Sequence, residues 1–98
     1  MTTEIWDCVT KAPFGEAASV FTIVRDGDRF TGTNVADIGE LPVVDGRIEG
    51  NRLVWKMPTE KPMRMMLVGK AIVMGERLTG TITMGAFGKA EMSGVRRA

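Results

Sequence analysis

Few side chains in this sequence have the types and spacing that catalysis or metal binding needs. The chain has one cysteine and neither histidine nor tyrosine, so it lacks the commonest general base, the commonest metal ligand and any Ser–His or Cys–His pair. Carboxylates with a single thiol rarely make a zinc site. We therefore expect no metal and no cofactor. Cys8, flanked by Trp6 and Thr10 on one strand face, is expected to be an unreactive thiol with a raised pKa.

Asp45 is the one carboxylate with apolar neighbours, because Leu41 and Val43 share its face in an extended segment. A carboxylate in apolar surroundings takes up a proton more readily and could act as a general base. The following Gly46 favours the alternative that Asp45 is a solvated residue at a β-bulge. Asp45 is the only catalytic candidate, and whether the chain is an enzyme stays open at this point.

A larger group of side chains suits ligand binding. Methionine is flexible and polarizable, so several methionines beside aromatic rings can form an adaptable opening for an apolar guest. The alternative is that they fill the core, as apolar stripes usually do. Four polar side chains on the same faces would each need a partner if buried: Cys8, Thr10, Ser19 and Asn34. The candidate ligand-binding residues are Phe14, Asn34, Trp55, Met57, Met65, Met84, Phe87 and Met92.

A repeated turn pattern predicts how these residues are positioned. The segment Asp26-Gly27-Asp28-Arg29-Phe30-Thr31-Gly32-Thr33 recurs as Met74-Gly75-Glu76-Arg77-Leu78-Thr79-Gly80-Thr81, and more weakly from Glu49 to Trp55. In each copy a glycine with polar neighbours precedes an arginine and an apolar residue, which is typical of a tight hairpin turn that leads into a strand. A hairpin repeated in so short a chain indicates an up-and-down β-barrel.

Alternating apolar side chains predict eight strands, and no segment has a helical period. The strands are expected at 4–11, 16–25, 29–36, 41–49, after Gly50-Asn51 up to Met57, at 63–73, after Gly75-Glu76 up to Met84, and after Gly88 up to Arg96. We predict an all-β fold, an eight-stranded antiparallel up-and-down (meander) barrel that forms a single domain over residues 1–98. The tight turns and both termini would share one end, and the longer loops would share the other.

Trp6 is expected to lie across the end of the barrel that carries the tight turns. Arg96 on the last strand would cover its ring in a cation–π contact. Three inward-facing glycines would leave room for the indole: Gly32, Gly80 and Gly94. Farther inside, Gly69 and Ala71 are expected to make room for Trp55.

These residues resemble those of the calycins, the lipocalin- and avidin-like barrels that hold small molecules. Phe30-Thr31-Gly32-Thr33 is similar to the avidin third strand, and Glu4-Ile5-Trp6 occupies the place of the lipocalin Gly-x-Trp. The chain also resembles a group of small bacterial proteins that end in a Gly-x-Arg pattern such as Gly94-Val95-Arg96. The resemblance implies a calycin-like barrel with a small molecule in its lumen. Asn34 and Ala36 stand where an avidin has its polar biotin contacts, so the resemblance supports the fold more than that ligand.

Charge and hydropathy limit the partners that we expect. A net charge of +1 argues against a nucleic-acid binder, and no stretch approaches the ~20 apolar residues of a membrane helix. The first residues lack a signal-peptide pattern, so the cytoplasm is the expected location. Outward apolar residues predict a homodimer through the strand faces; they are Val9, Val20, Val24, Val54, Met66, Val68 and Ile72.

The leading hypothesis from the sequence is a non-catalytic barrel that binds a small apolar molecule through its methionine- and phenylalanine-lined end. A second hypothesis is a small barrel enzyme, an isomerase, lyase or cyclase that orients a hydrophobic substrate. A third is a structural or protein-interaction module with a solid core. An inward carboxylate at Asp45 would favour the second hypothesis, and a filled interior would favour the third.

Overall fold

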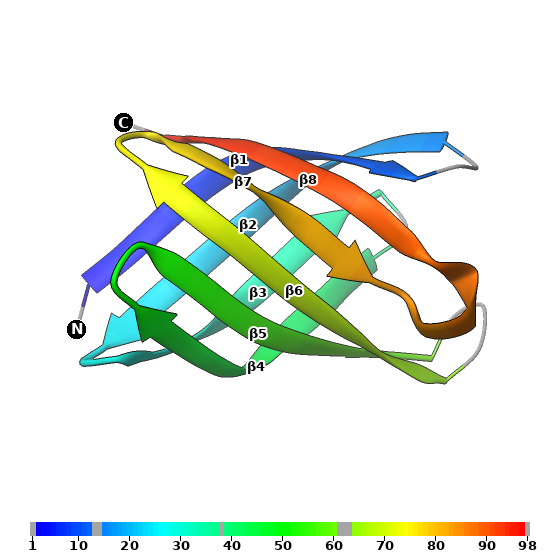
Figure 1. The fold of residues 1–98 in the computed structure, drawn as a ribbon, viewed down its shortest axis with the longest axis horizontal. Coiled ribbons are helices and arrows are strands. Elements are labelled where there is room, and N and C mark those ends of the chain that lie inside the picture. The colour runs from blue at the N-terminus through cyan, green and yellow to red at the C-terminus, as the bar shows by residue number, and fades with distance from the viewer. Residues whose placement is uncertain (1, 13–14, 38, 61–63, 98) are drawn as a thin grey trace.

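The computed structural model describes residues 2–12, 15–37, 39–60 and 64–97. Its eight strands pair into a closed barrel (Figure 1). Each strand is antiparallel to the next, and β8 pairs with β1. The predicted all-β, eight-stranded up-and-down barrel is confirmed. The elements are β1 (Thr2–Ala12), β2 (Gly15–Asp26), β3 (Arg29–Ala36), β4 (Gly39–Glu49), β5 (Arg52–Thr59), β6 (Met65–Met74), β7 (Arg77–Thr83), the 3₁₀ turn η1 (Gly85–Phe87) and β8 (Lys89–Arg96). Within the described ranges, no helix has the length and hydropathy to cross a membrane.

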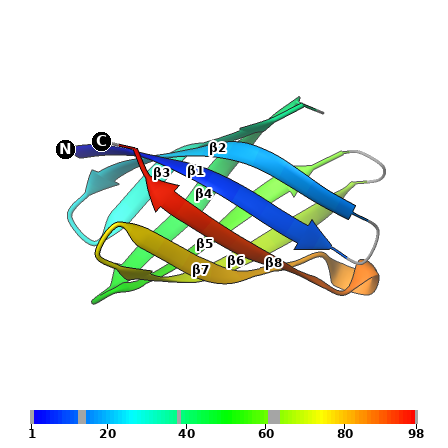
Figure 2. The same ribbon diagram turned by 90° about the horizontal axis from the view of Figure 1, so that it is seen from above.

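Three tight turns lie at one end of the barrel, where β1 begins and β8 ends (Figures 1 and 2). Gly27, Gly50 and Gly75 take the first turn position, with φ values of 67°, 62° and 64°. A positive φ there is the geometry of a type II′ turn, which glycine adopts without a Cβ clash and which matches the twist of paired strands. The repeated sequence pattern is therefore a repeated hairpin. We call this end the turn end and the opposite end, which carries η1, the loop end.

Alternating side chains from all eight strands converge on one core, as the sequence predicted. Trp6, Phe21, Trp55 and Ile82 all belong to it. Its buried members are Trp6, Cys8, Phe21, Ile23, Phe30, Val43, Leu53, Trp55, Met57, Ala71, Leu78, Ile82, Ala90 and Met92. The interior of an eight-stranded barrel is only wide enough for such side chains or for one small ligand.

Trp55 is fully buried in this core. Its ring centroid lies 4.9 Å from that of Phe21 and 6.2 Å from that of Phe30. Gly69 is its partner on β6, and a Cβ added at Gly69 would stand 2.2 Å from Trp55 Cε2. The indole therefore occupies the space that the missing side chain leaves, which confirms the expected role of Gly69.

The inward glycines that were assigned to Trp6 have a different role. A Cβ at Gly32 would lie 1.8 Å from the carbonyl oxygen of Thr22, and one at Gly94 would lie 2.7 Å from Cys8 Sγ. Both glycines thus permit close approach to the neighbouring strand rather than to the Trp6 indole. The sequence-based assignment is wrong because it considered only the barrel interior and not the contact between paired strands.

A β-bulge interrupts the pairing of β3 with β4. The register shifts between the Phe30–Gly46 and Gly32–Val43 pairs. Asp45 has a φ of 51°, the only positive φ of a non-glycine residue in the described part of the chain. The extra residue reverses the alternation along β4, so Val43 and Gly46 are buried while Asp45 is exposed. The bulge expected at Asp45-Gly46 is confirmed.

The pairing of β4 with β5 stops before either strand ends. The ladder ends at Val44 and Lys56, although β5 runs on to Thr59, past the loop start that the sequence predicted. In the same register Pro42 would stand opposite Pro58, and neither residue has an N–H to donate. Proline is tolerated in a strand where that side is unpaired. Beyond Lys56 the two strands diverge toward the loop end (Figures 1 and 2).

Candidate functional site

The loop end of the lumen brings together most of the predicted ligand-binding residues. Met57 and Met92 are buried in the core, and Met84 is half-buried and packs against it with Leu41 and Leu67. Met65 is half-buried at the start of β6. Phe14 lies outside the described residues, and Phe87 lies in η1 with its side chain outside the described part.

Among the described residues, three buried side-chain polar atoms in this lumen have no hydrogen-bond partner. They are Ser19 Oγ, Asn34 Oδ1 and Trp55 Nε1. An unpaired buried donor or acceptor costs about 1–3 kcal/mol, so three of them reduce appreciably a total stability of about 5–15 kcal/mol. Native proteins rarely leave such groups unpaired, so each calls for a ligand, a water or a functional reason. Ser19 and Asn34 are among the polar residues that the sequence placed inside.

Strand register and ring contacts group these atoms around Phe21. Ser19 lies two residues before Phe21 on β2, and Asn34 is the partner of Phe21 on β3. The Trp55 ring packs on Phe21. Asn34 Nδ2 lies 3.8 Å from Met57 Sδ, a contact that joins β3 to β5 inside the barrel. Register thus places Ser19 and Asn34 beside Phe21 on neighbouring strands, and the Trp55 ring packs on the same phenylalanine. We call the three unpaired atoms the polar trio.

Asn34 presents its oxygen rather than its nitrogen as the free group. A thioether sulfur accepts hydrogen bonds and cannot donate them, so the Met57 sulfur favours the amide nitrogen of Asn34 as its neighbour. The Asn34 Oδ1 is left as a buried acceptor without a donor. The trio thus comprises an N–H donor, a carbonyl acceptor and the Ser19 hydroxyl, which can do either.

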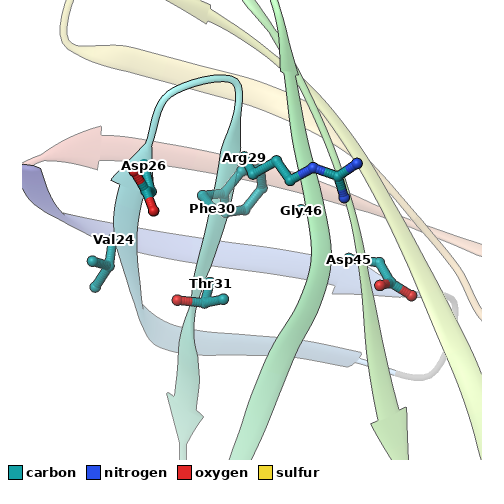
Figure 3. A pocket seen from close by; sticks show the side chains of 7 residues that line it. All are labelled: Val24, Asp26, Arg29, Phe30, Thr31, Asp45 and Gly46. Atoms are coloured by element: carbon teal, nitrogen blue, oxygen red, sulfur yellow. The ribbon is translucent and has the colours of Figure 1, made fainter. Parts of the chain in front are cut away.

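Asp45 does not reach this region. It is exposed at the bulge, on the rim of an outer hollow of about 310 Å³ that Asp26, Arg29 and Thr31 also line (Figure 3). The expected inward, apolar setting of Asp45 is therefore wrong. The bulge is the physical reason, because its extra residue moves position 45 from the face of Val43 to the outer surface.

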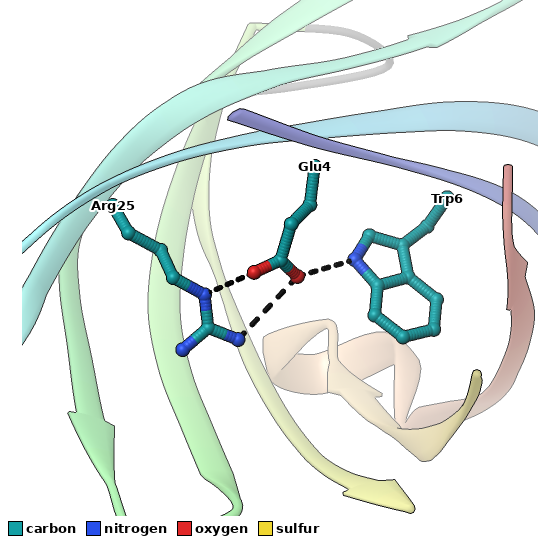
Figure 4. A network of polar contacts seen from close by, with 3 residues as sticks. All are labelled: Glu4, Trp6 and Arg25. Atoms are coloured by element: carbon teal, nitrogen blue, oxygen red, sulfur yellow. Dashed lines mark hydrogen bonds and ion pairs between the residues drawn. The ribbon is translucent and has the colours of Figure 1, made fainter. Parts of the chain in front are cut away.

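The turn end of the lumen is closed by a polar network that the sequence analysis missed (Figure 4). Glu4 is buried, and its Oε1 accepts a hydrogen bond from Trp6 Nε1 at 3.2 Å. Arg25 Nε donates to Glu4 Oε2, and Arg25 Nη2 lies 3.4 Å from Oε1. Every polar atom of the Glu4 carboxylate is thus engaged. Glu4 lies two residues before the inward Trp6 on β1, so strand alternation is the signal that could have placed it inside.

Arg96 does not take the role that we expected for it. It lies opposite Trp6 in the β1–β8 register, yet its side chain is exposed. The Trp6 N–H donates instead to the buried Glu4 carboxylate. The two tryptophans therefore differ: the Trp6 N–H is paired, and the Trp55 N–H is not.

Cys8 is buried in the core, with its thiol directed toward the backbone oxygen of Trp6 at 3.8 Å. Burial, with a smaller effect from the Asp7 charge, raises the pKa of the Cys8 thiol to about 12. The predicted raised pKa is confirmed, and the thiol is protonated at neutral pH. Among the described residues, no group of three or more cysteines and carboxylates is arranged to hold a metal ion.

The outer wall carries the apolar residues on which the dimer prediction depends. Met66 is 49% exposed and Ile72 is 42% exposed on β6, while Val54 and Val68 beside them are half-buried. On β1 and β2, Val9, Val20 and Val24 are also half-buried. A second outer hollow, of about 160 Å³, lies over Val9, Leu78 and Val95. The homodimer stays a prediction.

No model of a protein family, no curated protein and no solved structure matches the chain.

Proposed function

We propose that this chain is a small-molecule-binding barrel that holds a largely apolar guest at the loop end of its lumen. The observation that carries the proposal is the polar trio, Ser19 Oγ, Asn34 Oδ1 and Trp55 Nε1, buried without partners. A guest with a polar group would satisfy these atoms and recover part of the free energy that leaving them unpaired costs. Binding of such a guest would therefore stabilise the folded chain.

The side chains around the trio are of kinds that can rearrange to admit an apolar guest. Met57, Met84 and Met92 can change rotamer to admit a guest, since methionine has three rotatable bonds and no branch. Met84, Leu41 and Leu67 are only half-buried against the core, so packing constrains them less than it does the buried core residues. The turn end, by contrast, is closed by the paired Glu4, Arg25 and Trp6 side chains.

The unpaired stretch between β4 and β5 offers a route of entry. Backbone hydrogen bonds hold most of the barrel wall together, but the β4–β5 ladder ends at Val44 and Lys56. Pro42 and Pro58 cannot extend it, because neither has a backbone N–H. Met57 lies on this stretch of β5 and contacts Asn34, so a guest could enter by parting two strands without breaking a ladder hydrogen bond.

Binding is favoured over catalysis by the position of the ionisable groups. Asp45, the candidate general base, is exposed on the outer wall. Glu4 is the only buried charged residue in the described part of the chain, and it is already paired with Arg25 and Trp6. The trio can hold and orient a molecule, but none of its members exchanges a proton readily at neutral pH.

Methionine methyl signals in a ¹³C NMR titration test this function. The probes are toluene, methylcyclohexane and cyclohexanol, each added to the full chain, with signals assigned from single Met→Leu variants. We expect saturable shifts of the Met57 and Met92 methyls. Met66 and Met74, which are 49% and 73% exposed on the outer wall, serve as internal controls. Shifts confined to Met66 and Met74, or no shift with any probe, would contradict lumen binding.

A further inference from the structure

We infer that the guest carries one neutral polar group that both donates and accepts hydrogen bonds, a hydroxyl or an unsubstituted amide, on an apolar body. The inference rests on the proposed function and names the chemical class of the ligand. It follows from the kind of hydrogen bond that each member of the polar trio can make, and from the absence of an uncompensated charge among the described lumen residues.

The trio needs a guest that offers a hydrogen-bond donor and a hydrogen-bond acceptor at the same time. Trp55 Nε1–H can only donate, so it needs an acceptor on the guest. Asn34 Oδ1 can only accept, so it needs a donor, and the Met57 sulfur fixes this orientation of the amide. A hydroxyl supplies both functions from one oxygen, and an unsubstituted amide supplies them from the oxygen and the nitrogen on one carbon. The Ser19 hydroxyl can rotate to complete either arrangement.

Charged and purely hydrocarbon guests fit less well. A carboxylate would satisfy Trp55 but would set a negative charge beside Asn34 Oδ1 with no free cation in the described lumen. Arg25, which is 27% exposed, already pairs with Glu4 at the turn end. An ammonium group would satisfy Asn34 but face the Trp55 N–H. Burial of an uncompensated charge is costly, and a hydrocarbon would leave all three atoms unpaired.

The two indole N–H resonances provide a direct test with a built-in control. The Trp55 N–H is unpaired and should move downfield when a guest accepts from it, whereas the Trp6 N–H already donates to Glu4 and should stay. The probes share one ring: cyclohexanol, cyclohexanecarboxamide, methylcyclohexane, cyclohexanecarboxylate and cyclohexylammonium. Trp6→Phe and Trp55→Phe assign the two signals in ¹H–¹⁵N spectra of the full chain.

We expect cyclohexanol and the carboxamide to shift the Trp55 N–H and to bind roughly tenfold or more tightly than methylcyclohexane, the factor that one good hydrogen bond supplies. Asn34→Leu keeps the volume and removes the acceptor, so it should weaken binding of the alcohol by roughly the tenfold of one hydrogen bond and leave the affinity for the hydrocarbon unchanged. Asn51→Leu, in an exposed turn, is the matched control. If Asn34→Leu fails to fold, the relative affinities of the probes for the wild-type chain still test the inference.

The outcomes separate this inference from the proposed function. If methylcyclohexane and cyclohexanol bind equally, with the Met57 methyl shifted and the Trp55 N–H unmoved, the lumen binds guests but the inference is overturned. Tightest binding by the carboxylate or the ammonium probe would also overturn it. If no probe moves either the Met57 methyl or the Trp55 N–H, the proposed function itself fails.

Discussion

Gly69→Ala should destabilise the barrel because its new methyl group would collide with Trp55. The added Cβ would stand 2.2 Å from Trp55 Cε2 and 2.4 Å from Cζ2, whereas carbon atoms pack at about 3.5–4.0 Å. The indole would have to move by more than about 1 Å, and Phe21 and Phe30 hold its other sides. Overpacking of this kind costs about 1–3 kcal/mol, and the better strand propensity of alanine returns about 0.5–1 kcal/mol.

We therefore expect Gly69→Ala to lower the free energy of unfolding by about 1–2 kcal/mol, which corresponds to a fall of about 5–10 °C in Tm for a chain of this size. Urea unfolding followed by far-ultraviolet circular dichroism measures it. Lys70→Ala, on the exposed face of the same strand, is the control. Trp55→Phe removes the colliding ring atoms, so Gly69→Ala should cost at least about 1 kcal/mol less in that background. An equal cost in both backgrounds would refute the packing of Trp55 over Gly69.

Three further predictions follow from the turn end, the thiol and the outer wall. Glu4→Gln should lower the free energy of unfolding by about 2–3 kcal/mol, less than the loss of a fully buried pair costs, because Arg25 is 27% exposed. In urea titrations this loss should exceed that of Asp7→Asn, whose partner Arg97 is exposed. Equal losses would contradict a structural role for the Glu4–Arg25 pair. Burial raises the pKa of the Cys8 thiol from 9.0 to about 12, so the stability that the protonated thiol contributes is full below pH 9 and is lost as the pH rises toward 12. Cys8→Ala should therefore reduce the loss of stability at alkaline pH. Rapid labelling of the native chain by a thiol reagent at pH 8 would disprove a buried thiol. The expected homodimer should dissociate in the Met66→Lys and Ile72→Lys variants, and native mass spectrometry that finds only wild-type monomer at micromolar concentration would exclude it.

Side-chain alternation was enough to predict which faces meet inside the barrel. Phe21, Trp55 and Ile82 come from three strands, and each lies in the core because its neighbours two residues away share its face. The turns at Gly27 and Gly75 were predictable because a positive φ restricts the residue type. These features depend on local sequence, so a single chain is sufficient to find them.

The arrangement of the candidate site depends on strand register and on contacts between distant residues, which local sequence does not contain. The exposed position of Asp45 depends on which residue the bulge adds to β4. The match of Pro42 to Pro58 requires the β4–β5 register. Burial of Glu4 depends on the Arg25 guanidinium across the β1–β2 pair, which compensates for its charge. The unpaired state of Asn34 Oδ1 depends on how all the side chains around Asn34 pack, which the sequence does not give.

Intermolecular NOEs between cyclohexanol and the protein test most directly whether a guest occupies the lumen. Lumen binding predicts NOEs from the ring protons of cyclohexanol to the Met57 methyl and to the Trp55 indole, with none to the outward Met66 methyl. NOEs to Met66 alone, or water NOEs at the Trp55 N–H that persist unchanged at saturating cyclohexanol, would contradict a guest site at the polar trio.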